Sequence, residues 1–213
     1  MHLNRTIRPW LAAAALLAFG TLASAASFDC AKAKSPMEKL ICSDAQLSTL
    51  DEQLNTAFKD AVTRSKARPQ LVQWQREWLK SYEVTQCKDA RCLSKEFTAR
   101  IAVLQSVAPA TAASAEWNGV YTDKDHADLS LVALQDGKVY IAGDAVWYGP
   151  NAANGQVNVG EIRGVGTLRS GLLAYDDGGC SATMALQRGG LVVKDDSGCG
   201  GMNVSFRGDY RRK

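Results

Sequence analysis

Two parts of contrasting composition meet at one short stretch of the chain, Ser106-Val107-Ala108-Pro109-Ala110-Thr111-Ala112-Ala113-Ser114-Ala115. This stretch is small, uncharged and interrupted by proline, which is typical of a linker. Of the 18 glycines, 17 lie at or after Gly119, and residues 26–105 contain none. Because glycine supplies the backbone conformations of tight turns, we expect hairpins only after the linker. We therefore predict a two-domain α+β protein, with helices over 26–105, a linker over 106–115 and an all-β domain over 116–213.

The part before the linker is rich in Leu, Ala, Lys, Gln and Glu, and its apolar residues recur at helical spacing. Ser35-Pro36-Met37-Glu38 supplies an N-cap serine, a proline at the first helical position and a glutamate three residues after the cap, which together form a capping box. We predict a small antiparallel bundle of four helices, which run from this box to Cys42, from Asp44 to about Arg64, from Pro69 to near Cys87, and from Asp89 to about Leu104.

The part after the linker alternates short apolar runs with turn residues, which is typical of antiparallel strands. The predicted strand segments are 117–122, 129–134, 138–142, 145–148, 156–163, 166–168, 172–175, 182–187, 191–195 and 203–210. Gly119-Val120-Tyr121 near the start is echoed by Gly208-Asp209-Tyr210 at the end. We expect the first and last strands to pair, so that the sheet forms a small barrel or sandwich of about eight strands.

The first 25 residues have the features of a cleaved export signal. Arg5 and Arg8 precede an apolar run from Trp10 to Leu22, and Ala23-Ser24-Ala25 then provides a small-residue cleavage site. The run is shorter than the roughly 20 apolar residues of a membrane anchor. No cysteine directly follows the cleavage site, which disfavours a lipid anchor. We predict a periplasmic or secreted protein without a membrane anchor.

Six cysteines follow the signal, and an oxidising compartment favours three disulfides over a metal site. The predicted helices bring the first four cysteines to one end of the bundle. Four cysteines allow three pairings, of which we favour the local ones, Cys30 with Cys42 and Cys87 with Cys92. Cys180 and Cys199 flank the hairpin around Gly189-Gly190 and are expected to pair across it.

Motifs of the helical part occur in one order along the chain: Ser27-Phe28-Asp29-Cys30-Ala31-Lys32-Ala33, Glu38-Lys39-Leu40-Ile41-Cys42-Ser43-Asp44, Leu47-Ser48 with Leu50-Asp51, Gln75-Arg76 with Trp78-Leu79, and Cys87 through Cys92-Leu93 to Arg100-Ile101. In this order, residues 27–104 resemble the family defined by the N-terminal domain of the lysozyme inhibitor LprI. The resemblance implies a bacterial envelope protein that inhibits lysozyme. It does not extend to residues 116–213.

Several side chains have both a functional and a structural interpretation. Asp123, Asp125, His126 and Asp128 suggest a metal site, but they do not fit the calcium-loop template, and a solvated turn is favoured. The doublets Asp176-Asp177 and Asp195-Asp196 resemble an acid and base pair, but aspartate before glycine is typical of turns. Leu71, Trp74, Trp78 and Tyr82 at helical spacing form either the helix core, which is favoured, or an aromatic surface for a glycan or a partner.

An enzyme is disfavoured. Ser181 and Ser197 lack a nucleophile elbow, His126 is the only imidazole after the signal, and disulfide-bonded cysteines supply no thiolate. Removal of the signal leaves 23 basic and 22 acidic side chains, which favours neither nucleic acid nor an anionic membrane. We predict no catalytic residue, no metal and no cofactor.

The leading hypothesis is a binding protein that occludes the active site of a glycosidase such as lysozyme. The predicted contact residues lie in a loop from Lys194 to Gly200 beside Cys199, namely Lys194, Asp195, Asp196, Ser197 and Gly198. Residues 116–210 contain 12 acidic and 7 basic side chains, which would attract a basic enzyme. The alternatives are an envelope structural or assembly factor that binds another periplasmic protein, and a cell-wall hydrolase.

Overall fold

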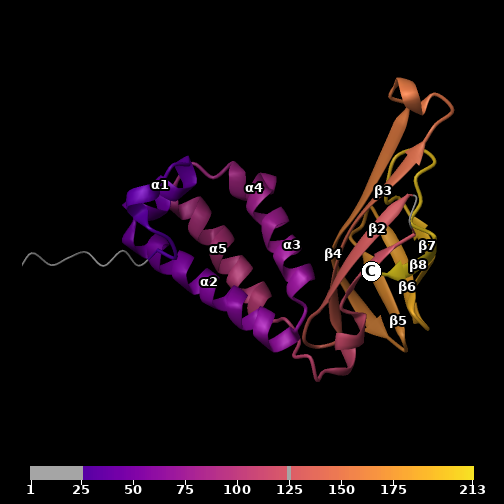
Figure 1. The fold of residues 1–213 in the computed structure, drawn as a ribbon, viewed down its shortest axis with the longest axis horizontal. Helices are drawn as coiled ribbons and strands as arrows, with labels where there is room; N and C mark the ends of the chain where they lie inside the picture. The colour runs from indigo at the N-terminus through magenta and orange to yellow at the C-terminus, as the bar shows by residue number, and fades with distance from the viewer. Residues whose placement is uncertain (1–25, 124–125) are drawn as a thin grey trace, which may run out of the picture.

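A computed structural model describes residues 26–123 and 126–213, in which a helical region lies beside a closed β-barrel (Figure 1). The expected signal peptide over 1–25 lies outside the described residues. No helix within 26–123 or 126–213 is long and apolar enough to span a membrane.

The helical region contains one short 3-10 helix and five α-helices: η1 (Cys30–Lys32), α1 (Pro36–Ser43), α2 (Ala45–Ser65), α3 (Arg68–Lys80), α4 (Tyr82–Thr85) and α5 (Ala90–Gln105). The capping box is confirmed, because the Ser35 hydroxyl accepts from the Glu38 amide at 3.1 Å and the Glu38 carboxylate accepts from the Ser35 amide at 2.8 Å. The carboxylates of Asp44 and Asp89 accept from backbone amides in the first turns of α2 and α5. Local capping therefore fixes where these helices begin.

The predicted third helix is wrong in one respect, because it breaks at Ser81 instead of continuing towards Cys87. Ser81 is extended, with φ −63° and ψ 157°, so α3 ends at Lys80 and α4 begins at Tyr82. Leu71 and Trp74 are buried as expected of core residues. The break turns Tyr82 away from that stripe, and 76% of its surface is exposed.

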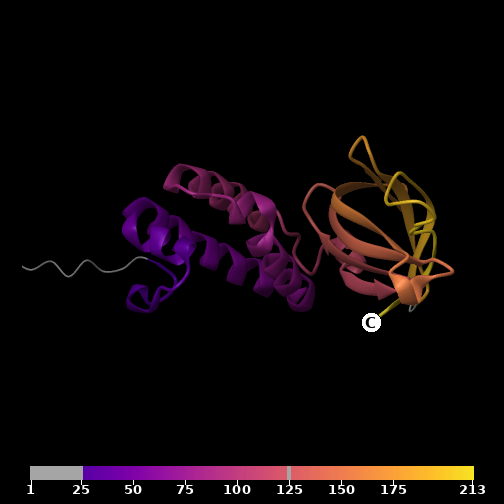
Figure 2. The same ribbon diagram turned by 90° about the horizontal axis from the view of Figure 1, so that it is seen from above.

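The barrel consists of eight antiparallel strands in chain order: β1 (Gly119–Thr122), β2 (Ala127–Ala133), β3 (Lys138–Tyr148), β4 (Val157–Arg169), β5 (Leu172–Asp176), β6 (Ser181–Gln187), β7 (Gly190–Ser197) and β8 (Gly208–Arg212). Two 3-10 turns, η2 (Ala113–Trp117) and η3 (Ala152–Asn154), precede β1 and follow β3. The pairing of β1 with β8, including Tyr121 opposite Arg212, closes the barrel as predicted. Figure 2 shows the strands curving round into this closed sheet.

Four predicted strand segments merge into two long strands, β3 and β4. Breaks were expected near Gly143 and Gly164, but the strands run through both, and neither glycine has a positive φ. A Cβ on Gly143 would lie 2.4 Å from the Leu129 side chain, and one on Gly164 would lie 2.8 Å from the Tyr175 ring. These glycines therefore make room for side chains of neighbouring strands and do not form turns.

The last predicted strand, 203–210, is shorter than expected. Asn203 has a φ of 66°, in the left-handed region that interrupts a strand, and β8 begins only at Gly208. Before it, Asp196 accepts hydrogen bonds from the Ser205 hydroxyl at 2.8 Å and the Phe206 amide at 2.9 Å. Asp196 thus anchors the segment that enters β8.

The stretch 106–115 has linker composition but is packed between the two regions. Val107 and Ala108 are buried, and the Ala108 amide donates to the Ala133 carbonyl at 3.0 Å. Val132 and Leu134, from β2 and the residue that follows it, belong to the apolar core of the helical region. The helical region and the barrel are therefore joined by buried side chains.

All three expected disulfides form: Cys30–Cys42, Cys87–Cys92 and Cys180–Cys199. Three disulfides fit a protein of the extracellular space or the periplasm.

Candidate functional site

The β3–β4 hairpin projects beyond the rest of the barrel (Figure 1). On one side, β2 pairs with β3 only as far as Ala145. On the other side, β5 pairs with β4 only over Thr167–Arg169. The outer end of the hairpin therefore has only two strands, with the segment 199–201 bonded to the edge of β4 at residues 159–161, and residues 149–156 form its tip.

Large apolar side chains are exposed at this outer end. Tyr148 opposite Val157, and Val146 opposite Val159, share one face because directly paired residues point the same way. The exposed fractions are 56% for Tyr148, 67% for Val159 and 79% for Met202, whose carbonyl accepts from the Asn158 amide side chain at 2.6 Å. We call Tyr148, Val157 and Val159 the hairpin surface.

A disulfide-linked segment braces the free edge of β4 beneath this surface. The Glu161 amide donates to the Cys199 carbonyl at 3.1 Å, and the Gly201 amide donates to the Val159 carbonyl at 3.1 Å. Gly160 has no room for a side chain, because a Cβ there would lie 2.5 Å from the Cys199 carbonyl oxygen. The Cys180–Cys199 disulfide ties this segment to the residue before β6, so the hairpin is held from the side.

The contact residues predicted from the sequence lie next to this brace, but mostly not in a loop. Lys194, Asp195, Asp196 and Ser197 belong to β7, and only Gly198 onward leaves the strand. Asp196 is engaged with the segment before β8. The structure thus connects the predicted segment to the hairpin through Cys199 and Gly200.

Charged groups surround the base of the hairpin. Arg163 of β4 forms ion pairs with Glu161 and, at 2.9 Å, with Glu77 of α3. Although burial disfavours its charge, the hydrogen bonds with Glu77 and Glu161 raise the pKa of Arg163. Desolvation, followed by the charge of Glu161 on the paired strand, raises the pKa of Asp144.

A cleft of about 800 Å³ lies between α3, α4 and α5 on one side and β3 and β4 on the other. Trp74 of α3 stacks on Tyr140 of β3, with ring centroids 3.9 Å apart. Trp78, Tyr82 and Val165 also line the cleft. Figure 1 shows α3 as the helix that faces the barrel.

Arg100 of α5 lines the same cleft and is 4% exposed. Its guanidinium carbon lies 4.0 Å from the Trp74 ring centroid and 5.5 Å from that of Trp78. Its Nε donates to Gln75 Oε1 at 2.9 Å, whereas its buried Nη2 has no hydrogen-bond partner. Burial lowers the pKa of Arg100 to about 10, so the side chain remains charged at neutral pH.

The other carboxylates singled out in the sequence serve turns and loops. Asp123 accepts from the amides of His126 and Ala127, which agrees with the turn interpretation, and Asp125 lies outside the described residues. Asp128 pairs with Lys213. No three His, Cys, Asp or Glu residues of the described chain are placed together as a metal site.

The turn interpretation is confirmed for only one of the two aspartate doublets, because Asp195-Asp196 lies in β7 and Asp196 accepts from Ser205 and Phe206 instead of from a nearby turn. Asp176 accepts from the Gly178 amide, and Asp177 accepts from the amides of Gly179 and Cys180, as the turn interpretation predicts. Ser181 and Ser197 face each other on the paired strands β6 and β7. His126 has its ring near Tyr148, with centroids 6.5 Å apart.

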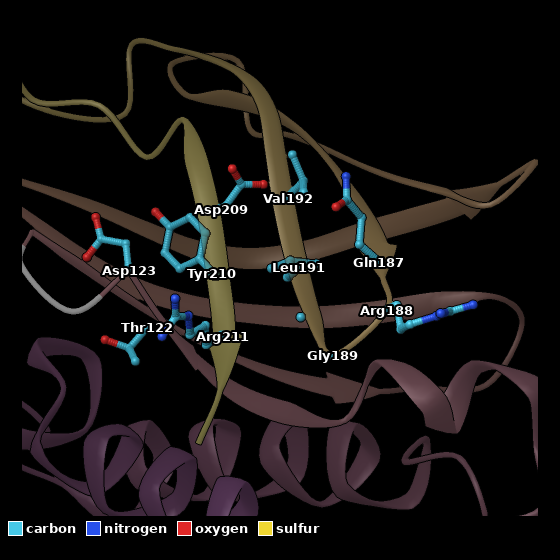
Figure 3. Close-up of a pocket in the computed structure, with 11 residues that line it drawn as sticks. Thr122, Asp123, Gln187, Arg188, Gly189, Leu191, Val192, Asp209, Tyr210 and Arg211 are labelled. Atoms are coloured by element: carbon cyan, nitrogen blue, oxygen red, sulfur yellow. The ribbon is translucent and has the colours of Figure 1, made fainter.

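A smaller hollow of about 310 Å³ lies beside the seam that closes the barrel (Figure 3). It is lined by residues of β1, β6, β7 and β8 and of the segments that join them, among them Asp123, Tyr210 and Arg211. The Tyr210 hydroxyl is already used, because it donates to the Phe206 carbonyl at 2.7 Å. Figure 3 shows Arg188 extending away from the other lining side chains. The side chains that line this hollow do not converge on one point where a ligand could bind.

No family model, curated protein or solved structure matches the chain. The resemblance of residues 27–104 to the LprI family therefore stays a prediction.

Two features of the site were missed at the sequence level. One missed feature is the length of β4. Gly160, Gly164 and Gly166 lie at even-numbered positions and therefore on one face of a strand, and this pattern indicates a strand whose face is closely packed. Arg100 is the second, because its contacts with Gln75 and two tryptophans join residues 22 to 26 positions apart in the sequence. No local pattern reports such contacts.

Proposed function

We propose that this protein is an exported binding protein that inhibits a lysozyme-type glycosidase by inserting the β3–β4 hairpin into the sugar-binding cleft of the enzyme. One observation carries the proposal: the two-stranded end of the hairpin projects from the barrel and exposes Tyr148, Val157 and Val159. Exposed apolar side chains on a projecting element are typical of a protein-binding surface.

Rigidity supports this role. The Cys180–Cys199 disulfide and the backbone bonds of residues 199–201 hold β4 from the side, so little conformational entropy is lost on binding. The tip adds hydrogen-bonding groups, since Asn151 and Asn154 are exposed there. Amide side chains can donate to the two carboxylates of a glycosidase active site.

Charge supports the same kind of partner. The barrel region over 116–213 contains 12 acidic and 10 basic side chains, a net charge of −2, which weakly favours encounter with a basic enzyme at low ionic strength. In this proposal the helical region and the barrel act as two domains, with the LprI-like helical domain as a platform for the hairpin. An envelope assembly factor would use the same surface on another partner.

The test is a titration of lysozyme activity with the purified, oxidised protein. Val157→Asp combined with Val159→Asp should abolish inhibition, because each places a charge on the hairpin surface without disturbing the buried core. Val165→Asp is the matched control, since Val165 is 46% exposed but lies at the base of the hairpin. The control should inhibit as the unmodified protein does.

Each outcome separates one hypothesis from another. If a stoichiometric amount of protein leaves lysozyme fully active, the inhibitor proposal fails and the assembly-factor alternative gains support. If the double variant still inhibits while Lys194→Ala does not, the contact surface lies on β7, as the sequence predicted, and not on the hairpin. Release of sugar from peptidoglycan by the protein alone would support the hydrolase alternative.

A further inference from the structure

The cleft between the helical region and the barrel contains a buried cation without an acid partner. None of the ion pairs among the described residues includes Arg100. The guanidinium lies over the faces of Trp74 and Trp78, donates to the neutral oxygen of Gln75 and interacts with Tyr140. A buried guanidinium usually pairs with a carboxylate, so this arrangement is unusual for a purely structural side chain.

The unused donor defines the ligand group that this cation can bind. Nη2 of Arg100 is buried and has no hydrogen-bond acceptor, while Nε is already committed to Gln75. Because Gln75 and the tryptophans fix the plane of the guanidinium, its remaining donors are oriented in advance. A planar group of this kind binds a carboxylate with charge-assisted hydrogen bonds.

The walls of the cleft add a second requirement. Trp78, Tyr82 and Tyr140 line it with aromatic rings. Tyr82 is 76% exposed, so its ring can stack on a ring of the ligand. Besides Arg100, the charged side chains that line the cleft are Glu77, Lys80, Glu83, Glu96, Glu161 and Arg163. Carboxylates accept hydrogen bonds from hydroxyl groups, and they repel ligands that carry several negative charges.

We propose that this cleft binds a sugar acid, a pyranose ring with a single carboxylate, which pairs with Arg100 while the ring lies against Trp78 and Tyr82 and its hydroxyls donate to the glutamates. The volume of about 800 Å³ is within the range of small-molecule sites. This site lies apart from the hairpin surface and does not depend on the proposed inhibition.

Binding is measured by calorimetry on the full chain with three probes. N-acetylmuramic acid carries both a ring and a carboxylate, N-acetylglucosamine has the ring without the carboxylate, and acetate has only the carboxylate. We expect the acid sugar to bind at least about tenfold more tightly than either control. Its affinity should fall as sodium chloride is added. Equal affinity for N-acetylglucosamine, or no heat with any probe, overturns the proposal.

Two variants test the assignment of residues. Arg100→Met keeps an unbranched apolar side chain but removes the guanidinium and its charge, and we expect about 30-fold weaker binding of the acid sugar with no change for the neutral one. Tyr82→Ala should weaken binding of both sugars several-fold, and its exposed position leaves the fold intact. Tyr148→Ala, on the hairpin, is the matched control and should bind normally.

The same variants distinguish inhibition by the hairpin from sugar-acid binding in the cleft. Arg100→Met should still inhibit lysozyme, and the hairpin double variant should still bind the acid sugar. If Arg100→Met does not fold, Tyr82→Ala and the three probes on the unmodified protein decide the question. Unchanged affinity in a folded Arg100→Met protein would assign Arg100 to the core alone.

Discussion

Asp144 is a residue whose charge opposes folding. It lies directly opposite Glu161 on the paired strand, and desolvation together with that neighbouring charge raises its pKa above the ordinary value of 3.8. The folded protein therefore holds this proton more tightly than the unfolded chain. Ionisation of Asp144 destabilises the folded state at neutral pH, and this cost disappears as the pH falls below 3.8.

The corresponding prediction is that Asp144→Asn unfolds at a higher temperature than the unmodified protein at pH 7, and that the difference is lost at about pH 3. Thermal melts followed by circular dichroism at both pH values measure it. Glu52→Gln removes a carboxylate from an exposed position of α2 and is the control, with no comparable gain expected. A gain for Asp144→Asn that persists undiminished at the acid pH would contradict the prediction.

At the scale of elements, the three disulfides close loops of different size. Cys180 and Cys199 are 19 residues apart, whereas Cys87 and Cys92 are 5 apart. In the chain-entropy model these bridges stabilise the fold by about 3 and about 2 kcal/mol respectively. Paired Cys→Ala substitutions should therefore differ by about 1 kcal/mol in urea unfolding, with the barrel variant the less stable. Equal losses would refute the loop-length argument.

Element positions were predictable where local chemistry fixes them. The capping box at Ser35 and the aspartate caps of α2 and α5 are visible in the sequence, and so is the pairing of the two ends of the barrel. Gly143 and Gly164 misled the strand prediction because a glycine that makes room for Leu129 or Tyr175 looks the same in a sequence as one that turns the chain. The cleft was not predictable, since Arg100 and Tyr140 meet only through tertiary packing.

Across the whole molecule, the helical region depends on the barrel for part of its core. Leu134, which follows β2, is 4% exposed and belongs to the helical core. Leu134→Asp should therefore lower the melting temperature of the helical signal, because it places an unpaired charge in that core. Far-ultraviolet circular dichroism measures the helices, and Val157→Asp, at an exposed position of β4, is the control. Unchanged melting of the helices in Leu134→Asp would show that the two regions fold separately.

The shared core also has a consequence for the order of events during synthesis. The ribosome makes the helices first, but Val132, Leu134 and Tyr140, which complete their packing, are added only after the whole of α5. Until then Trp74 has no aromatic partner from β3 to stack on. The nascent helices must therefore keep an apolar side exposed while about 35 further residues are polymerised. A holding chaperone would bind this exposed side of α3, and formation of β2 and β3 would release it.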